Sequence, residues 1–336
     1  YIVHNYYALG GNNIDISKWN SSDDTILLLA TGKACLQGGK EIDYIEEYKK
    51  VLSELEKDKR GSGVATIKSL RYITKVKKLE KLKYADYMGG NGAAMRTSII
   101  GIIYHQDKDL DKLIEQSILA SRITHNYSLG FLGGLVTALF TSYAIRGIEP
   151  LKWIENLLKL EKSGKIDSII KKTNIYDNYQ KDKEKFWDRW YLYSESRLPK
   201  RKYNSSKFVF PLERLVDLES YTPSITKGET DTNYSKFGAS GIGSVIVAYD
   251  SLLMCMSSSS KHKFLPLDKP KEIKYNWDSL VFFSALHFGD NDTTGTIAGA
   301  WYGALRGYDG INQEKMKQLE FYTELNKISQ QIFNFI

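Results

Sequence analysis

Hydrophobic side chains recur along this chain at the three- to four-residue spacing of helices, and almost no stretch alternates with the two-residue period of a β-strand. This spacing predicts helices over residues 41–56, 99–104, 110–121, 127–145, 181–193, 245–256 and 315–332. Charge and glycine replace the periodicity in residues 57–63, and further loops are expected at residues 200–202 and 257–260. The pattern therefore predicts an all-α fold.

The longest uncharged run, residues 127–145, is near the lower limit of length for a membrane span. Gly130, Gly133 and Gly134 interrupt this run. We therefore expect a buried core helix there and no association with a membrane.

Glycines recur every four residues near the C-terminal end, at Gly295, Gly299, Gly303 and Gly307. On a helix they would form one nearly smooth ridge, which lets another backbone approach closely at a cost in helix propensity. We expect this helix to be central and tightly packed, with Gly303 facing another helix at close range.

Composition narrows the class of protein without fixing its function. With 336 residues the chain could form one large domain or two small ones. Its formal net charge of +7 is diffuse, so it could attract anionic substrates but does not indicate a nucleic-acid partner. Cys35 and Cys255 lie in apolar helical surroundings, as expected of free buried thiols in a reducing, intracellular compartment such as the cytoplasm.

The richest chemistry lies at Gly289-Asp290-Asn291-Asp292-Thr293, which follows an apolar stretch and opens the glycine-bearing helix. Unpaired carboxylates are too costly to bury in such surroundings, so a positive charge must meet them. Oxygen ligands from Asp and Thr are the set that Mg²⁺ or Ca²⁺ prefers. Helix capping is the simpler alternative, but it accounts for one aspartate more easily than for two.

A second acidic helix start lies near the other end of the chain, at Ser22-Asp23-Asp24-Thr25. Ser22 is well placed as the N-cap, and acidic residues in a first turn are common, so this pattern is weak by itself. If the two acidic helix N-termini converge, however, they form one oxygen-rich site.

Two segments of small residues could let a ligand approach the backbone closely: residues 89–96, which open a helix, and residues 237–244. The first suits a phosphate, although it matches neither the Walker loop nor the dinucleotide fingerprint, and a plain turn remains an alternative. His125 stands between two predicted helices. Histidines in such connections are more often structural, but this one could donate to a ligand oxygen.

Taken together, these motifs resemble the ADP-ribosylglycohydrolase family over nearly the whole chain. The family's early S/T-D-D-T corresponds to Ser22-Asp23-Asp24-Thr25, and its late G-D-x-D-[ST] corresponds to Gly289-Asp290-Asn291-Asp292-Thr293. Its G-N-G-x-A-M-R turn corresponds to Gly90-Asn91-Gly92-Ala93-Ala94-Met95-Arg96. Residues 122–145, with Thr124-His125 and a T-A-L-F-T-S-Y-A run, resemble the arginine-specific branch.

The resemblance implies a single domain over residues 1–336, folded as a compact orthogonal helical bundle with a central binuclear Mg²⁺ site. The implied metal ligands are Ser22, Asp23, Asp24, Asp290, Asp292 and Thr293, and Asp23 or Asp24 would be the catalytic base. The residues expected to bind substrate are Gly90, Asn91, Gly92, His125, Phe237, Gly238, Ser240 and Gly241. The implied partners are ADP-ribose and an ADP-ribosylated protein, with no nucleic acid or membrane, and the chain is expected to be a monomer.

The activity implied is hydrolysis of the glycosidic bond between ADP-ribose and a protein side chain, with arginine the expected linkage. Alternatives are a hydrolase of serine-linked ADP-ribose or O-acetyl-ADP-ribose, and a non-catalytic protein that binds ADP-ribose. The chain departs from the family at two places. The family's opening helix with a G-D-[AS]-x-G motif is not in this sequence, and Gly241-Ile242-Gly243 stands where the arginine-specific enzymes have a Gly-His-Asp step.

Overall fold

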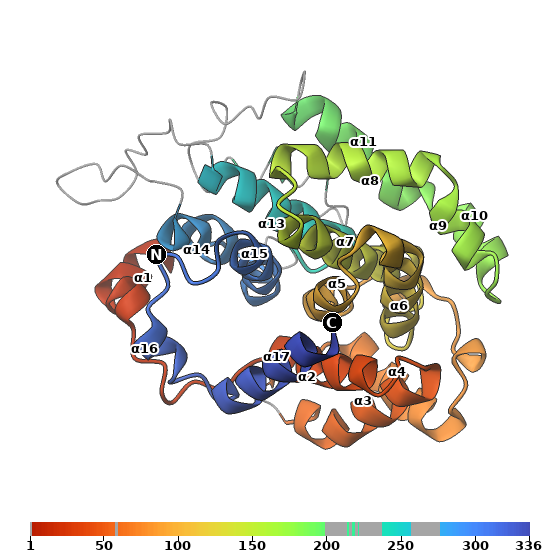
Figure 1. Ribbon diagram of the computed structural model, residues 1–336, viewed down its shortest axis with the longest axis horizontal. Coiled ribbons are helices and arrows are strands. Elements are labelled where there is room, and N and C mark those ends of the chain that lie inside the picture. Colours follow the sequence, from red (N-terminus) through yellow and green to blue (C-terminus); the bar gives the residue numbers. More distant parts are fainter. Residues whose placement is uncertain are drawn as a thin grey trace.

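The structure is a computed structural model that describes residues 2–57, 60–198, 214, 217, 218, 221, 237–256 and 276–336. The loops expected at residues 200–202 and 257–260 lie outside these ranges. Within them the secondary structure is helical and no strand forms, so the prediction of an all-α fold is confirmed (Figure 1). A single antiparallel bridge joins Gly90 to Ser240.

The helices follow one another along the chain as follows. The α-helices are α1 (Ile2–Ala8), α2 (Asp23–Leu36), α3 (Glu41–Leu55), α4 (Val64–Val76), α5 (Ser98–Ile103), α6 (Leu110–Arg122), α7 (Ser128–Ile145), α8 (Trp153–Lys162), α9 (Lys165–Ile170), α10 (Tyr176–Asp182), α11 (Glu184–Arg197), α13 (Gly241–Met256), α14 (Trp277–Ala285), α15 (Asn291–Arg306), α16 (Gln313–Met316) and α17 (Tyr322–Phe335). Short 3₁₀ turns include η4 (Asp86–Met88) and η5 (Ala94–Arg96).

Helix α7 is the centre of the core, and α5, α6, α13 and α15 all pack against it (Figure 1). It is the one described helix long and apolar enough to cross a membrane, but 94% of that window is buried inside the protein. The prediction of a buried core helix is therefore confirmed. Glycines let its neighbours approach closely, because a Cβ at Gly133 would lie 2.8 Å from the Gly241 carbonyl carbon.

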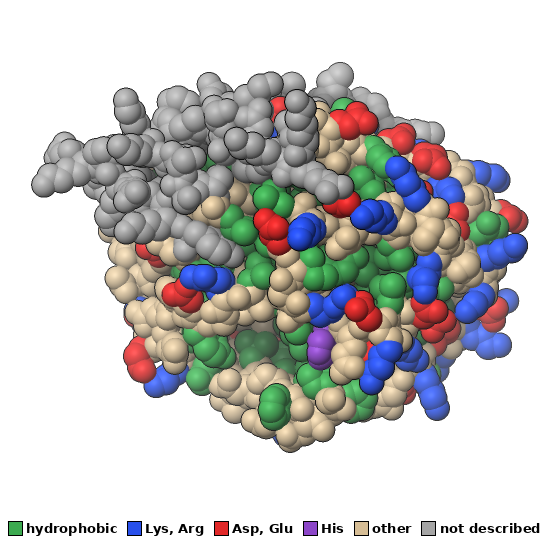
Figure 2. Space-filling view, turned by 45° about the horizontal axis from the view of Figure 1, so that its top comes forward, with side chains coloured by type: hydrophobic (Ala, Val, Ile, Leu, Met, Phe, Trp, Pro, Cys, Tyr) green, Lys and Arg blue, Asp and Glu red, His purple; other side chains and the backbone are tan. Residues whose placement is uncertain are grey.

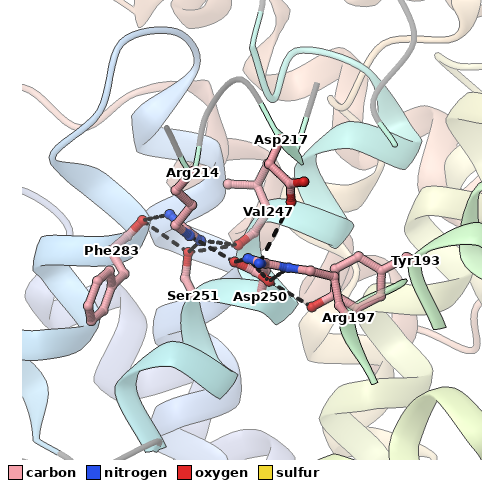
Figure 3. A network of polar contacts seen from close by, with 8 residues as sticks. All are labelled: Tyr193, Arg197, Arg214, Asp217, Val247, Asp250, Ser251 and Phe283. Carbon is pink, nitrogen blue, oxygen red and sulfur yellow. Dashed lines mark hydrogen bonds and ion pairs between the residues drawn. The ribbon is translucent and has the colours of Figure 1, made fainter. Parts of the chain in front are cut away.

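A buried ion-pair network anchors α13 to its neighbours (Figure 3). Asp250 of α13 accepts hydrogen bonds from Arg197 Nη2 at the end of α11 and from Arg214 Nε, both at 2.8 Å. Tyr193 also donates to Asp250 at 2.9 Å, and Arg214 donates to the Phe283 carbonyl oxygen of α14 at 2.9 Å. A fully buried carboxylate is tolerable only with such partners.

A second cross-link joins the two ends of the chain. Arg60 donates to both carboxylate oxygens of Glu320, at 2.7 and 2.8 Å, and to the Ser21 carbonyl oxygen at 2.9 Å. The Ser21 N–H in turn donates to Glu320 at 2.8 Å. Helix α17 packs along α2 beside this cross-link (Figure 1). The segment that leads into the first acidic motif is thereby fixed to the C-terminal part of the chain.

Several predicted boundaries were wrong. The stretch 181–193 divides between α10 and α11, and 315–332 divides between α16 and α17. Helix α13 begins at Gly241, four residues before the predicted start, because the Ser240 hydroxyl accepts from the Gly243 N–H at 2.9 Å and caps the helix.

The glycine ridge of α15 was also wrong in part. A Cβ at Gly295 would meet Ala285 at 3.3 Å and one at Gly299 would meet Trp277 at 3.5 Å, which are side chains of α14. At Gly303 no described atom lies within 4 Å of that position. Among the described residues, the expected close helix contact at Gly303 is therefore not found.

Surface charge is mixed in sign. Acidic and basic side chains are interspersed over the described part of the face in Figure 2, in keeping with a diffuse net charge of +7. Cys35 and Cys255 are both free and buried, as predicted.

Candidate active site

Two acidic helix N-termini meet in space although they lie at opposite ends of the sequence. Helix α2 begins at Asp23 after extended backbone at Ser22, and α15 begins at Asn291 after Asp290. Carboxylates at these positions are stabilised by the positive end of a helix dipole. Ser22 stands at the N-cap position but makes no cap hydrogen bond; its hydroxyl donates to Asp24 Oδ2 at 2.9 Å instead.

The four carboxylates line one cavity of about 260 Å³. Its lining residues come from separate parts of the chain: Asp23, Asp24, Gly61, Gly63, Val64, Ala65, Thr66, Gly90, Asn91, Gly92, Met95, His125, Ala239, Asp290, Asp292 and Thr293. Asp23 and Asp24 are buried, whereas Asp292 is exposed. The buried part of the cavity lining, at Asp23 and Asp24, is therefore acidic, and the cavity opens to solvent near Asp292.

Burial and mutual repulsion raise the pKa of three of these carboxyl groups, Asp23, Asp24 and Asp290. Burial, followed by the charges of Asp292 and Asp290, raises the pKa of Asp23 to about 7. Burial, then Asp292 and Asp23, raises the pKa of Asp24 to about 8. Burial and contact with the Asp292 carboxyl raise the pKa of Asp290 to about 7. Carboxylates so close together are stable in ionised form only if positive charge lies among them.

The donor set suits a hard cation. Asp24 Oδ1 is buried and has no hydrogen-bond partner among the described residues, so one carboxylate oxygen lacks the partner that burial demands. Carboxylate and hydroxyl oxygens are the ligands that Mg²⁺ prefers. Within the described ranges, however, no three His, Cys, Asp or Glu side chains form a ready-made metal cage. The carboxylates surround the cavity and would have to be drawn inward by a cation.

Asn91 links the turn at residues 89–96 to Asp290 and to the 237–240 segment. Its side-chain amide donates to Asp290 Oδ2 at 2.7 Å and to the Gly238 carbonyl oxygen at 3.0 Å. Its backbone N–H donates to the Ala239 carbonyl oxygen at 3.0 Å, so this N–H is not available to a phosphate. The turn and the 237–240 segment are therefore held together and positioned against Asp290.

The flanking glycines of this turn make room for His125. A Cβ at Gly92 would lie 2.6 Å from His125 Cε1, and one at Gly90 would lie 3.2 Å from His125 Nε2. Burial, followed by the charge of Arg96, lowers the pKa of His125 to about 3. The imidazole is therefore neutral, and it cannot supply a proton as a general acid near neutral pH.

The structure separates the predicted site residues into two groups. Those that line the cavity are Asp23, Asp24, Asp290, Asp292, Thr293, Gly90, Asn91, Gly92 and His125. Five others, Ser22, Phe237, Gly238, Ser240 and Gly241, are not among its described lining residues. They support it instead: the Phe237 carbonyl oxygen accepts from the Asp290 N–H at 2.9 Å, and the Gly241 N–H donates to the Gly89 carbonyl oxygen at 2.9 Å.

One wall of the cavity was missed. Gly61, Gly63, Val64, Ala65 and Thr66, between α3 and α4 or in the first turn of α4, line it beside Met95. The sequence predicted only a loop of charged and glycine residues over 57–63. The small residues Gly61-Ser62-Gly63 directly before a helix were the available signal.

Comparisons with known proteins point to one family. A family model described as ADP-ribosylglycohydrolase matches residues 5–336. The chain is 32% identical to "ADP-ribosylhydrolase ARH1" of Dictyostelium discoideum, over 99% of this chain and 86% of that protein. It is 26% identical to "ADP-ribosylhydrolase ARH3" of Homo sapiens, over 93% of this chain and 77% of that protein.

A solved structure shows the same fold. The "ADP-ribosylglycohydrolase-related protein complex" superposes with a TM-score of 0.54, covering 94% of this chain and 81% of that chain. At 16% sequence identity this likeness concerns the fold alone.

Proposed function

The chain belongs to the ADP-ribosylglycohydrolase family, whose members hydrolyse linkages to ADP-ribose, and from this premise we propose that it uses Mg²⁺ to release ADP-ribose from protein arginine side chains. The observation that carries the proposal is the meeting of Asp23 and Asp24 with Asp290 and Asp292 at one cavity. Neither helix N-terminus alone would distinguish a catalytic site from ordinary capping.

Two Mg²⁺ ions would be held by Ser22, Asp23, Asp24, Asp290, Asp292 and Thr293. Support comes from the partnerless Asp24 Oδ1 and from the mutual repulsion of the carboxylates. When bound, Mg²⁺ supplies the positive charge that offsets these carboxylates and orients the hydroxyl groups of the terminal ribose.

The chain's own residues would then carry the proton transfer. Water attacks the anomeric carbon of the ribose, and a carboxylate takes the proton that the water loses. Asp23 and Asp24 are the candidates because both are buried and line the cavity. The bond between the anomeric carbon and the guanidine nitrogen breaks, and the departing guanidine takes up a proton from the carboxyl group that accepted it or from solvent.

The leaving group favours arginine over serine. The titratable side chains among the described lining residues are the four aspartates and His125. His125 is neutral and cannot serve as the acid that an alkoxide leaving group would need, and the aspartates would be ionised once Mg²⁺ lies among them. A guanidine is basic enough to be protonated without a dedicated acid. The resemblance of residues 122–145 to the arginine-specific branch points the same way.

Substrate contacts follow from the cavity walls. We assign Gly90, Asn91, Gly92 and His125 to ADP-ribose, because these four residues of the predicted binding set line the cavity. Phe237, Gly238 and Gly241 would act indirectly, through their hydrogen bonds to Asp290, Asn91 and Gly89, and Ser240 through its bridge to Gly90.

The test compares two peptides of equal concentration, one ADP-ribosylated on arginine and one on serine, incubated with Mg²⁺ or with a chelator. Free ADP-ribose is expected to appear faster from the arginine peptide, and only with Mg²⁺. Faster release from the serine peptide would overturn the arginine assignment and leave the family unaffected. Binding of ADP-ribose without release from either peptide would identify a non-catalytic binding protein.

A further inference from the structure

A buried guanidinium lies close to the cavity and makes no direct contact with a carboxylate among the described residues. The Arg96 side chain is fully buried, its charge acts on Asp23 from a distance, and its guanidinium carbon lies 5.1 Å from the centre of the Tyr48 ring. Its donors instead reach neutral oxygens: the Tyr48 hydroxyl at 3.0 Å, the carbonyl oxygens of Gly92 and Ala120, and the Thr124 hydroxyl at 2.7 Å. Such a costly arrangement calls for a specific role.

The Thr124 hydroxyl connects Arg96 to His125. Thr124 Oγ1 accepts from Arg96 and lies 2.8 Å from His125 Nδ1. Thr124 is fully buried, and its hydroxyl carries a single hydrogen. If that hydrogen points at His125 Nδ1, the Arg96 guanidinium donates to Thr124 Oγ1 and the Thr124 hydroxyl donates to Nδ1, so both donors have an acceptor. If Nδ1 carried the hydrogen instead, the buried hydroxyl hydrogen would have no acceptor among the described residues.

The first arrangement places the remaining imidazole hydrogen on Nε2. His125 is only 3% exposed and lines the cavity, with its Nε2 edge over Gly90 and Gly92. Within the described part of the chain, Nε2 has no hydrogen-bond partner. A donor on a rigidly held ring therefore borders the space that a ligand would fill.

We infer that Arg96 and Thr124 are positioning residues that hold His125 in the Nε2–H form, so that it donates to an acceptor oxygen of the ligand. The inference rests on the proposed function for the identity of that ligand, ADP-ribose, which offers hydroxyl and phosphate oxygens. The nearby guanidinium also disfavours a second proton on the ring, which agrees with the lowered pKa of His125. His125 is thus a binding residue and not an acid.

The tautomer is tested directly by ¹⁵N nuclear magnetic resonance on ligand-free protein labelled at its five histidines. The His125 signals are assigned by their loss in His125→Gln. We expect the pattern of an Nε2–H imidazole in the natural protein and in Thr124→Ser, which keeps the hydroxyl. Thr124→Val keeps the shape and removes the hydroxyl, so it should give a mixture of tautomers. An Nδ1–H pattern in the natural protein would overturn the inference.

ADP-ribose affinity, measured by calorimetry, supplies the second readout. Loss of the donor in His125→Phe should weaken binding about tenfold. Thr124→Val keeps the donor in part of the molecules and should weaken binding less, by about twofold, and Thr124→Ser should restore it. The matched control is Thr141→Val, since Thr141 is equally buried but its hydroxyl bonds only to the Thr137 carbonyl oxygen of its own helix. An affinity equal to that of the control in folded Thr124→Val would contradict the positioning role.

The positioning of His125 and the proposed function can fail separately. If Thr124→Val does not fold, the spectrum of the natural protein and the affinity of His125→Phe, which keeps a ring but no donor, still decide. If the natural protein shows the Nε2–H form but binds no ADP-ribose, the arrangement of Arg96, Thr124 and His125 stands and the proposed function falls.

Discussion

At the scale of single residues, the four cavity carboxylates differ in their surroundings. Asp24 is buried and has one carboxylate oxygen without a hydrogen-bond partner among the described residues. Asp290, by contrast, accepts a hydrogen bond from the side-chain amide of Asn91. Asp290 is therefore the better position for a substitution, because an amide of the same shape can keep the contact with Asn91 while removing a negative charge.

We predict that Asp290→Asn lowers turnover at least about 100-fold and weakens Mg²⁺ binding, since even residues that only support metal ligands change affinity 10–100-fold. Helical content should not change, because no backbone contact is altered. ADP-ribose release, calorimetry with Mg²⁺ and circular dichroism give the three readouts. Asp188→Asn is the control: Asp188 is exposed on α11, away from the cavity lining. Normal turnover in Asp290→Asn would rule out a metal role for that carboxylate.

At this scale the sequence predicted which residue types form the site, but not which residues those side chains contact. Paired aspartates at two helix starts indicated where oxygen ligands lie, because the chemistry of buried carboxylates is local. The bond from Asn91 to Asp290 spans 199 residues of sequence, and the loop at Gly61 reaches the cavity only through tertiary packing. Neither could be deduced without the fold. That the carboxylates bind metal stays a prediction.

At the scale of helices, the importance of a glycine depends on what lies opposite it. Gly133 of α7 faces the Gly241 backbone at the start of α13, whereas no described atom lies within 4 Å of a Cβ position at Gly303 of α15. The regular glycine spacing in α15 correctly indicated close contacts at Gly295 and Gly299 but not at Gly303, and the irregular spacing in α7 gave no sign of the contact at Gly133. Which glycines are needed depends on the crossing of two helices that are distant in sequence.

Substitution by alanine should separate the two cases. Gly133→Ala forces a Cβ into a backbone that cannot move aside, and we expect a loss of about 1–3 kcal/mol or more in the free energy of unfolding. Gly303→Ala adds a methyl group without a clash and should gain about 0.5–1 kcal/mol through helix propensity. Urea denaturation measures both. Equal stabilities for the two variants would show that α7 and α13 do not approach as closely as described.

The division of the final predicted helix also has a tertiary cause. Residues 315–332 have helical amphipathicity, but the carboxylate of Glu320 is held by Arg60 and by the Ser21 N–H. These contacts fix a turn between α16 and α17. A helical pattern cannot reveal an interruption of this kind, because Arg60, which holds the turn, lies 260 residues away in the sequence.

At the scale of the whole molecule, the Asp250 network predicts how the fold responds to acid. Burial alone would raise the pKa of Asp250, but Arg197 and Arg214 outweigh burial and hold the pKa below its usual value. A carboxyl group of this kind stabilises the fold above its unfolded-state pKa of about 3.9, and that contribution is lost as the pH falls toward the lower folded-state pKa.

Asp250→Asn should destabilise the fold by about 3–5 kcal/mol at pH 7, because it leaves two buried guanidinium groups without their main counter-charge. It should also flatten the loss of stability below about pH 4, since the titrating group is gone. The control Asp111→Asn removes a carboxylate that pairs with Lys165 at the surface, and little change is expected. Urea denaturation at several pH values tests this; an acid response equal to that of the natural protein would place the sensitive group elsewhere.

Mg²⁺ should stabilise the whole molecule, because its proposed ligands come from both ends of the chain. Asp23 and Asp24 lie on α2, which packs against α17, and Asp290 and Asp292 lie on or beside α15. A cation that binds all four is lost when either end detaches, so it favours the folded state by mass action. At 100 times its dissociation constant the gain is about 2.7 kcal/mol. The melting temperature should therefore rise with Mg²⁺ and not with NaCl of equal ionic strength, and the rise should shrink in Asp290→Asn. A melting temperature that is independent of Mg²⁺ would mean that these carboxylates share the cavity without a cation, through protons alone.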